Sequence, residues 1–484
     1  MAAIFDDDGP MTELKLHPDR LLPPDPAVLA IARRLYESVK DEPILSPHGH
    51  VPPIWIADDV PFTDPVSLLL SPDHYVTRLL HADGVNLSDL GVPPGTPLPE
   101  TQARQAWRIF CTRWPLFAGT AMKFWMETVL VDVFGVAVRP SADTADAIYD
   151  TIAAVLADPD FRPRALMDRF KIEFMATTDD PCDDLSHHKK LADDSSFHHR
   201  VTPTFRPDKY LEPARPDWPE LTRRLGEVSG VGTETYAGWL QAMRARRAWF
   251  KQNGAVSSDH AHIDAATQPM AVRDAEAAYE AALGERINAA QAKALQQTML
   301  FEQARMASED GLTMTLHPGV YRNHSTGTFQ RYGADVGADI PISCEFTRAL
   351  HPLLEAFGND PGLTLVLFTI DETVFSREIA PLSGFYSSVY YGVPWWFIDA
   401  PDAIKRFRAA TAESAGFSRC SGFIDDTRAF LSIPARHDMA RRLDCGYLAG
   451  LVADHRLAED EAAAAAHQLV VDNPRKVFHL GAAA

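Results

Sequence analysis

Short apolar runs alternate with helical stretches along most of this chain, and this alternation constrains its fold more than any other feature. The runs are rich in β-branched and aromatic residues and are bounded by turn residues, which is typical of buried strands. Strands that alternate with helices pair in parallel, and buried parallel strands are apolar on both faces. The eight runs lie at 43–50, 171–178, 201–206, 255–260, 313–317, 363–370, 387–393 and 422–425. Eight such units predict an α/β fold of the (β/α)8 barrel type.

The segments between these runs complete the predicted architecture. A helix at 26–40 precedes the first strand, amphipathic helices are expected at 218–252 and 270–309, and a helical tail covers 434–478. Residues 52–165 lack this alternation and are rich in tryptophan and phenylalanine, so we expect a large helical insertion after strand 1 whose aromatic side chains mostly form core packing. The predicted domains are a leader, 1–25; a barrel with C-terminal helices, 26–51 and 166–484; and the insertion, 52–165.

Charge and cysteine content exclude several classes of function. The chain has 484 residues and a formal net charge of −20, which argues against a nucleic-acid partner because phosphate binding requires clustered Lys and Arg. No apolar run reaches transmembrane length, so no membrane partner is expected, and the acidic first ten residues predict a disordered leader and no signal peptide. The five cysteines are scattered without a Cys-x-x-Cys pair, which favours a reducing compartment and a cytoplasmic location.

The first strand ends in two histidines separated by one glycine, Pro47-His48-Gly49-His50. Side chains two positions apart in a strand point to the same face, so His48 and His50 would share one face. Neutral imidazole is the commonest metal ligand among side chains. An isolated His-Gly-His is more often two surface histidines in a turn, so a metal site at this position requires further ligands elsewhere in the chain.

Polar residues follow the other predicted strands in the same way. Barrel active sites lie at the carboxyl ends of the strands, where these residues would meet. Each of them alone is more often a buried structural histidine or a helix-capping aspartate than a ligand. They are Arg206, Asp259-His260, His317, Asp371, Trp395-Trp396, Asp426 and Arg428. Strands one and eight are neighbours in a closed barrel, so Asp426 is the expected third ligand of a divalent ion, and two imidazoles with a carboxylate suit Zn²⁺.

Motifs along almost the whole chain, in this order, resemble the uronate isomerase (glucuronate isomerase) family, a branch of the amidohydrolase superfamily. The motifs are Pro47-His48-Gly49-His50, Asp73-His74-Tyr75 with Arg78, Thr177-Thr178-Asp179-Asp180-Pro181, Phe205-Arg206-Pro207-Asp208-Lys209, Ser258-Asp259-His260, Leu316-His317-Pro318-Gly319 with Arg322-Asn323, Trp395-Trp396-Phe397, Asp426-Thr427-Arg428 with Phe430-Leu431-Ser432, and Arg436-His437. Two positions depart from the family pattern: Ser46 stands where the family usually has Asp, and Asp371-Glu372-Thr373 replaces an Asn-rich turn.

The resemblance implies a barrel of the metal-dependent hydrolase type and an aldose–ketose isomerase of hexuronate catabolism. The implied reactions interconvert D-glucuronate with D-fructuronate and D-galacturonate with D-tagaturonate. The implied cofactor is a divalent metal, Zn²⁺, held by His48, His50 and Asp426. The expected partners are a small-molecule hexuronate and further copies of the chain in a homo-oligomer. No glycine-rich dinucleotide motif follows a predicted strand, so no nucleotide cofactor is expected.

The implied reaction passes through an enediolate, so it requires charge stabilisation and a proton shuttle. Arg428, two residues beyond Asp426, is expected to stabilise the developing negative charge. Arg206 is the first choice for the substrate carboxylate, because a guanidinium matches carboxylate geometry. The shuttle remains open among three candidates: Asp426, His317 and Tyr75. The further expected substrate contacts are His74, Trp395 and Arg322.

Two other functions compete with this interpretation. The first is a metal-dependent hydrolase on the same barrel that acts on a sugar acid lactone or amide. Such enzymes often use a histidine on strand six and a bridging lysine on strand four, where this chain has Asp371 and Asp259-His260. The second is a helical interaction protein with an acidic surface, which the eight strand patterns argue against.

Overall fold

The computed structural model describes residues 13–95 and 98–481 and has an α/β architecture built on parallel strands. Two sheets contain all the parallel strands of these residues, one with three strands and one with four. The strands are β1 (Ile44–Ser46), β2 (Ile172–Ala176), β3 (Arg200–Thr202), β4 (Ser257–His260), β5 (Thr313–Leu316), β8 (Leu365–Leu367) and β9 (Val389–Tyr391). Seven of the eight predicted runs therefore contain a strand, each shorter than its run.

The order of the strands follows the chain. The first sheet has the order β1-β2-β3 and the second has the order β4-β5-β8-β9, and every pair in them is parallel. A parallel bridge between Phe205 and Ser258 joins the two sheets. Another bridge pairs Tyr391 in β9 with Cys420. The segment after Cys420 returns to the first strand, because the His50 N–H donates a hydrogen bond to the Thr427 carbonyl oxygen at 3.0 Å.

The prediction of an eighth strand at 422–425 is wrong: the described chain has only the single bridge at Cys420 in this region. Gly422 has φ +84°, and a β-carbon at this position would lie 2.5 Å from the Pro474 ring. Asp426 also has a positive φ, of 42°. A strand needs extended backbone at successive residues, so these two positions prevent a regular ladder and turn the segment toward the site.

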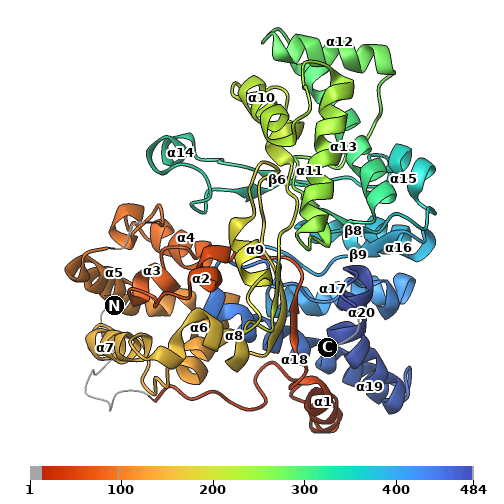
Figure 1. Cartoon of the computed structure of the whole chain (residues 1–484). Helices are drawn as coiled ribbons and strands as arrows, with labels where there is room; N and C mark the ends of the chain where they lie inside the picture. Colours follow the sequence, from red (N-terminus) through yellow and green to blue (C-terminus); the bar gives the residue numbers. More distant parts are fainter. Residues whose placement is uncertain (1–12, 96–97, 482–484) are drawn as a thin grey trace, which may run out of the picture.

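One antiparallel element was not predicted. The strands β6 (Val320–Tyr321) and β7 (Ile340–Pro341) pair with each other and flank helix α14 (Thr326–Tyr332). We call residues 320–341 the β6–β7 arm. In Figure 1, α14 projects from the body of the molecule above the helices near α4. Two-residue strands have almost no periodicity, so the sequence pattern could not identify them.

Helices cover the strands and connect them (Figure 1). They are α9 (Ser186–Ala192), α10 (Trp218–Ser229), α11 (Tyr236–Gln252), α12 (Val272–Leu283), α13 (Ala289–Asp310), α15 (His351–Phe357), α16 (Ala380–Phe385) and α17 (Pro401–Ala415). The single helices predicted at 218–252 and 270–309 are each two helices. Gly230 ends α10 with φ +69°, and Asn288 starts α13 with a capping box, and such caps interrupt an otherwise continuous apolar pattern.

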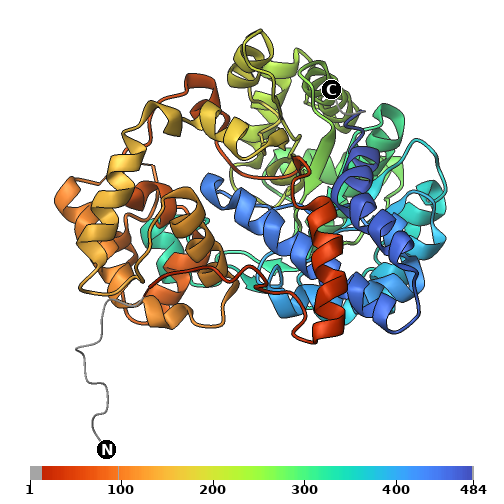
Figure 2. The same cartoon turned by 90° about the horizontal axis from the view of Figure 1, so that it is seen from below.

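A separate group of helices lies between β1 and β2 and gathers on one side of the molecule (Figures 1 and 2). The helices are α2 (Pro53–Asp58), α3 (Pro65–Leu69), α4 (His74–Ala82), α5 (Glu100–Thr112), α6 (Ala121–Thr128), α7 (Ala145–Leu156) and α8 (Pro163–Arg169). Trp107, Phe110 and Trp125 are buried among them. The same apolar core includes Ile172 of β2 and Phe430, so this group packs directly against the parallel strands.

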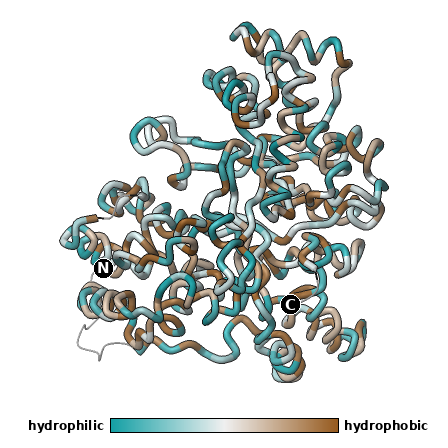
Figure 3. Tube along the Cα trace, in the orientation of Figure 1, coloured by the Kyte–Doolittle hydropathy of each residue, from teal (hydrophilic) through white to brown (hydrophobic). Residues whose placement is uncertain are grey.

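The C-terminal helices pack against the first helix of the chain. Helix α1 (Pro26–Val39) lies beside α18 (Ile433–Ala453) and α19 (Glu459–His467) in Figure 2, and a short helix α20 (Asn473–Val477) follows. Apolar and polar positions are mixed along these helices in Figure 3, and buried apolar residues of α1, α19 and the second half of α18 meet in a third core. No helix of the described ranges combines the length and hydropathy that crossing a membrane requires.

The predicted leader, 1–25, differs from the structure where it is described. Residues 1–12, and with them most of the acidic segment, lie outside the described residues. Glu13 forms an antiparallel bridge with Val138, and Leu14 is buried in the same core as the insertion helices. Asp25 then caps α1 by accepting hydrogen bonds from two backbone N–H groups. Residues 13–25 are therefore packed against the fold.

Candidate active site

A cavity of about 590 Å³ opens at the carboxyl ends of the parallel strands. His48 follows β1, Arg206 follows β3, and His317 follows β5, so residues distant in sequence meet there because parallel strands end at one edge. All the residues predicted for the site line this one cavity: His48, His50, His74, Tyr75, Arg206, His317, Arg322, Trp395, Asp426 and Arg428. Their individual roles remain proposals.

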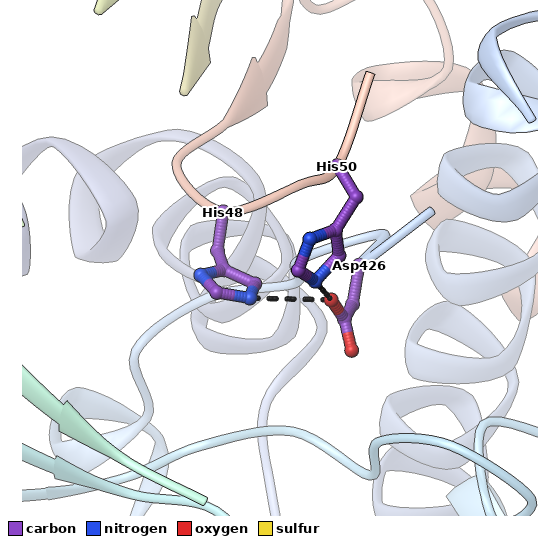
Figure 4. Close-up of side chains that lie close together, drawn as sticks. All are labelled: His48, His50 and Asp426. Atoms are coloured by element: carbon purple, nitrogen blue, oxygen red, sulfur yellow. Dashed lines mark ion pairs between the residues drawn. The ribbon is translucent and has the colours of Figure 1, made fainter. Parts of the chain in front are cut away.

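Three of these residues converge on one point at the bottom of the cavity (Figure 4). The Nε2 atoms of His48 and His50 lie 3.2 Å and 3.1 Å from the same carboxylate oxygen, Oδ1 of Asp426. His48 is 2% exposed at its side chain, and Asp426 is 14% exposed. The positive φ of Asp426 turns its side chain toward the end of β1, where both histidines lie.

His48 also belongs to a second group of possible ligands. His317 Nε2 lies 3.0 Å from Oδ1 of Asp259, and the His317 ring lies 5.0 Å from the His48 ring. The His317 ring stacks on Phe368 at 4.4 Å and meets the edge of Trp395 at 4.8 Å. We call His48, His50, Asp259, His317 and Asp426 the inner cluster. Its members are held from several sides, so the arrangement is formed before any substrate binds.

The inner cluster has the donors that a divalent metal requires. Possible ligand atoms of His48, His50 and Asp426 lie within 4.8 Å of one another, and so do those of His48, Asp259 and His317. Asp426 Oδ1 and His317 Nε2 are buried, and their close polar neighbours among the described residues, the two histidines for Asp426 and Asp259 for His317, do not have hydrogen-bond geometry. Unpaired buried polar atoms are costly unless something else satisfies them. Two imidazoles with one carboxylate, and open positions beside them, suit a catalytic Zn²⁺ or a similar ion.

The electrostatics of the cluster favour anionic aspartates. Burial would raise the pKa of Asp426, but the contacts with His48 and His50 outweigh it and hold this pKa well below its usual range. Burial would likewise raise the pKa of Asp259, but the side chains of His317, His48 and Arg206 lower it strongly. Burial lowers the pKa of His50 despite the nearby Asp426 carboxylate. A neutral imidazole and an anionic carboxylate are the forms that ligate metals.

Arg206 lies on the wall of the cavity beside the inner cluster. Its Nε donates a hydrogen bond to Asp208 Oδ2 at 2.8 Å, and its guanidinium lies 3.4 Å from Asp259 Oδ2. Both acids are themselves anchored, because Asp208 accepts a hydrogen bond from the Ala261 N–H at 3.0 Å and Asp259 accepts one from Thr315 Oγ1 at 2.6 Å. These carboxylates outweigh the effect of burial and raise the pKa of Arg206.

Tyr75 reaches the cavity from the first turn of α4. Asp73 caps this helix by accepting a hydrogen bond from the Tyr75 N–H at 2.8 Å. The Tyr75 hydroxyl donates to Asp399 and accepts a hydrogen bond from the Phe397 N–H at 2.9 Å. Arg436 donates to the other Asp399 oxygen at 3.0 Å. Burial and the Asp399 carboxylate raise the pKa of Tyr75 well above its usual range, so this hydroxyl keeps its proton.

A second group of charges lies nearer the mouth of the cavity. Arg428 lies 3.2 Å from Asp335, and Arg322 donates a hydrogen bond to Asp339 at 3.0 Å. His74 lies beside them, and burial together with Arg428 lowers its pKa to about 4. We call Arg428, Asp335, Arg322, Asp339 and His74 the outer wall. Asp335 and Asp339 come from the β6–β7 arm, so this unpredicted element forms part of the site.

Two residues at predicted strand ends do not line the cavity. His260 is fully buried, and its Nδ1 faces the Thr315 carbonyl oxygen at 3.1 Å. Asp371 caps a short 3-10 helix by accepting a hydrogen bond from the Thr373 N–H at 2.9 Å. Ser46, at the position of the family's usual Asp, is fully buried on β1, and its hydroxyl lacks a hydrogen-bond partner among the described residues.

Sequence reasoning assigned no role to several acids and one arginine of the site. They are Asp208, Asp259, Asp335, Asp339, Asp399 and Arg436. Asp259 was named with His317 among the strand-end residues, and Asp208 stood in a family motif, but neither was given a role. Arg436 stood in a family motif without an assigned role. Asp335, Asp339 and Asp399 lie in loops and had no periodic signal that could have identified them.

Comparison with known proteins gives one consistent result. A family model described as glucuronate isomerase matches residues 28–478. The chain is 58% identical over 467 residues to a uronate isomerase of Cutibacterium acnes, covering 96% of this chain and 99% of that protein. It is 51% identical over 468 residues to a uronate isomerase of Corynebacterium efficiens, covering 96% and 98% of the two chains.

Solved structures agree with the sequence comparison. The crystal structure of a glucuronate isomerase from Caulobacter crescentus superposes with a TM-score of 0.95 at 44% identity, covering 98% of both chains. The crystal structure of a uronate isomerase from Thermotoga maritima gives a TM-score of 0.89 at 27% identity, covering 96% of this chain and 99% of that one. The similarity therefore extends over both the strands and the helices between β1 and β2.

Proposed function

The chain belongs to the uronate isomerase family, and from this premise we propose that it interconverts D-glucuronate with D-fructuronate and D-galacturonate with D-tagaturonate. The observation that carries this proposal is the convergence of His48 and His50 on Asp426 inside a cavity that also holds Arg206 and Arg428. A metal-ligand cluster beside two guanidinium groups suits a substrate that is an anion and that develops a second negative charge during the reaction.

We propose that the strands close into a (β/α)8 barrel of the metal-dependent hydrolase type. The parallel order within each of the two sheets, the bridge between Phe205 and Ser258 that joins them, the bridge to Cys420 and the hydrogen bond from His50 to Thr427 support closure. The domain division proposed with it places the insertion at 52–165 and the barrel with its C-terminal helices at 26–51 and 166–484. The shared core around Ile172 argues that these parts fold together.

We propose that His48, His50 and Asp426 hold a divalent ion, with Zn²⁺ the ion that fits this donor set best. When bound, such an ion polarises the sugar oxygens and stabilises negative charge on them. Asp259 lies on the far side of His48 and is held anionic by Arg206 and His317, so it adds negative charge that strengthens cation binding.

The reaction moves a carbonyl from C1 to C2. C2 loses its hydrogen as a proton and C1 gains one, while O2 loses a proton and O1 gains one, through an enediolate. Arg206 is proposed to bind the substrate carboxylate, and Arg428 is proposed to stabilise the negative charge that develops on the enediolate. Trp395, Arg322 and His74 line the same cavity and are proposed as further substrate contacts.

The proton shuttle is proposed to be Asp426 or His317. Both lie in the inner cluster, and each has a buried atom without a hydrogen-bond partner among the described residues. Tyr75 is the weaker candidate, because its hydroxyl is engaged by Asp399 and its pKa is raised well above the usual value. A hydroxyl that keeps its proton at the pH of the reaction could act as a general acid but not as the general base.

We also propose a cytoplasmic location and a homo-oligomeric assembly. All five cysteines are buried and unpaired in the described structure, which supports a reducing compartment. The assembly rests on the family resemblance alone. The rival hydrolase activity on a sugar lactone or amide is disfavoured by the full-length match to the isomerase family.

A substrate panel on the metal-loaded protein tests the proposed function. We expect D-glucuronate or D-galacturonate to be converted to its ketose without a nucleotide cofactor, with some solvent deuterium at C1 of the product. The neutral hexose D-glucose should have a lower kcat/KM by about 10⁴-fold, because it leaves a guanidinium without its anion. Equal kcat/KM for glucose and glucuronate, or turnover of lactones and amides in place of hexuronates, would contradict the proposal.

A further inference from the structure

Arg428, the proposed charge-stabilising residue, is already paired with a carboxylate in the free protein. Its guanidinium lies 3.2 Å from Asp335, which lies between α14 and β7 on the β6–β7 arm. Among the described residues, Asp335 is the one carboxylate within 4.0 Å of Arg428. Arg322 also faces Asp335, at 4.0 Å. An anionic part of the substrate that approaches Nη2 of Arg428 competes with Asp335 for this position.

Asp335 differs from the other acids that pair with arginines in the cavity. Its side chain is 48% exposed, whereas those of Asp259, Asp339, Asp399 and Asp208 are 1%, 3%, 10% and 17% exposed and that of Glu212 is 37% exposed. Exposed ion pairs are weak because water competes for both partners and two side chains must be held in one geometry. Among the arginine-paired acids of this cavity, Asp335 is therefore the one that solvent or a ligand most readily replaces.

The anchoring of the acids shows the same contrast. Asp339 accepts hydrogen bonds from the Asn323 N–H at 2.6 Å and from Arg322 at 3.0 Å. Asp399 is held by Tyr75 and Arg436, and Asp259 by Thr315 and His317. Within the described part of the chain, the polar contacts of the Asp335 side chain are those with Arg428 and Arg322. Losing one partner costs less for a group that water can reach than for a buried one.

The backbone beside Asp335 is held by packing, so the Asp335 side chain can leave Arg428 without movement of the arm. Val336 is 5% exposed and packs in the core of the insertion helices. Gly337 has φ +88°, and a β-carbon there would lie 2.4 Å from Cγ of Arg78, so the arm lies directly on α4. These contacts keep Asp335 near Arg428 without fixing its carboxylate.

We infer that Asp335 is a placeholder for the substrate: its carboxylate neutralises Arg428 in the free enzyme and is displaced by an anionic oxygen of the bound uronate. This inference rests on the proposed function, because it needs an anionic substrate. The protein carries a net charge of −20, so it offers an anionic substrate no long-range attraction. Binding would depend instead on the local exchange of the Asp335 carboxylate for an anionic oxygen of the substrate. A neutral sugar lacks the carboxylate, so before the reaction it has no anionic group that could replace Asp335 at Arg428.

The variants Asp335→Asn and Asp335→Ala test this inference, with Glu212→Gln as the matched control. Glu212 is a half-exposed acid at the rim of the same cavity that pairs with Arg215 at 3.6 Å, so its loss removes one negative charge without touching Arg428. Two measurements are made on metal-loaded proteins. One is kcat and KM with D-glucuronate. The other is the Kd, by calorimetry, of L-gulonate, which is D-glucuronate with its aldehyde reduced, and of its neutral counterpart D-glucitol.

We expect kcat/KM for D-glucuronate to rise about two- to fivefold in both Asp335 variants, and less in Glu212→Gln, because the competing anion is gone. A rise in kcat with an unchanged Kd for L-gulonate assigns the displaced position to the enediolate oxygen. A lower Kd for L-gulonate, without a change for D-glucitol, assigns it to the substrate carboxylate and exchanges the roles of Arg428 and Arg206. Either result supports the placeholder.

Unchanged or lower kcat/KM together with an unchanged or higher Kd for L-gulonate overturns the inference; a fall in kcat would mean that Asp335 positions Arg428. If the wild-type protein converts no hexuronate, the proposed function fails by itself. The L-gulonate titration then decides the placeholder, because the carboxylate is the only anion that remains. A lower Kd for L-gulonate in the Asp335 variants than in the wild type would support the inference, and an equal Kd would contradict it.

Discussion

The inner cluster and the outer wall use similar residues in opposite ways. In the inner cluster, His48 is 2% exposed and Asp259 is 1% exposed, and both lie at the ends of strands. In the outer wall, Arg428 is 33% exposed and Asp335 is 48% exposed, and both lie in loops. Charges that are buried and held by strand ends cannot rearrange cheaply, whereas exposed pairs exchange partners readily. The proposed metal ligands therefore lie at tightly held positions, whereas Arg428, the proposed charge-stabilising residue, is paired with an acid that can exchange.

Loss of an inner-cluster ligand should have the largest effect. His48→Ala and Asp426→Ala should each remove bound divalent metal and lower kcat/KM by at least about 10³-fold, because they remove a ligand and, for Asp426, a candidate acid–base group. Metal analysis of the purified variants, with circular dichroism to verify folding, checks this. His260→Gln is the control, since His260 follows the same strand as Asp259 but lies outside the cavity. Full metal occupancy in both alanine variants would exclude the proposed site.

Arg428 belongs to the outer wall and Arg206 lies beside the inner cluster, and their replacement should change different kinetic constants. Arg428→Met should lower kcat by about 10²-fold, because it removes stabilisation that is needed most in the transition state. Arg206→Met should mainly raise KM for uronates, because it removes a contact made in the ground state as well. Steady-state kinetics with D-glucuronate distinguish these outcomes, and Arg215→Met at the rim controls for the loss of one positive charge. The opposite pattern would exchange the two assignments.

The Tyr75 hydroxyl should matter less than either arginine. Burial and Asp399 raise its pKa well above the usual range, so it stays protonated through neutral and moderately alkaline pH. Tyr75→Phe should lower kcat by about tenfold or less, whereas loss of a true proton shuttle costs about 10²–10⁴-fold. Comparing kcat of Tyr75→Phe with that of His317→Asn checks this ranking. A larger loss in the Tyr75 variant would make this hydroxyl the shuttle.

The smallest effect is expected at His74 of the outer wall. Burial, with the nearby Arg428, lowers its pKa from 6.5 to about 4, so the imidazole is neutral at pH 7. The unfolded chain binds a proton more readily than the folded one between these values, so this residue contributes stability that is lost as pH falls from about 6.5 toward 4. Melting temperatures of the wild type and His74→Gln at pH 7 and pH 4.5 check this.

The variant should lose less thermal stability on acidification than the wild type, and its KM for D-glucuronate should keep the wild-type pH profile between pH 6 and 8. An equal loss of stability in both proteins would show that His74 is not held neutral by its surroundings.

Most of the scaffold could be predicted from the sequence, and the errors have local causes. An apolar run such as that of β8 reports burial directly, whereas β4 (Ser257–His260) is buried although its residues are polar. The prediction of a strand at 422–425 was wrong because Gly422, and Asp426 directly after the run, have positive φ, which prevents an extended backbone. The predictions of two long helices missed the breaks at Gly230 and near Asn288, because an amphipathic pattern can continue through a helix cap.

In the candidate site, too, some residues could be identified from the sequence and others could not. Local pattern in the chain was sufficient to select His48, His50 and Asp426, since a strand places alternate residues on one face and parallel strands end at one edge. The family resemblance then supplied the reaction. Asp259 was selected by the same rule, although no role was assigned to it.

The partners of these residues depended on the path of the chain in three dimensions. Asp335 meets Arg428 across 93 positions because the β6–β7 arm folds back over α4, and Asp399 meets Tyr75 across 324 positions. No local pattern encodes such contacts: which loop carboxylate reaches which arginine is set by how the strands, the insertion helices and the arm pack together. Whether an acid is a permanent neighbour or an exchangeable one depends on its burial, and burial is a property of the folded molecule.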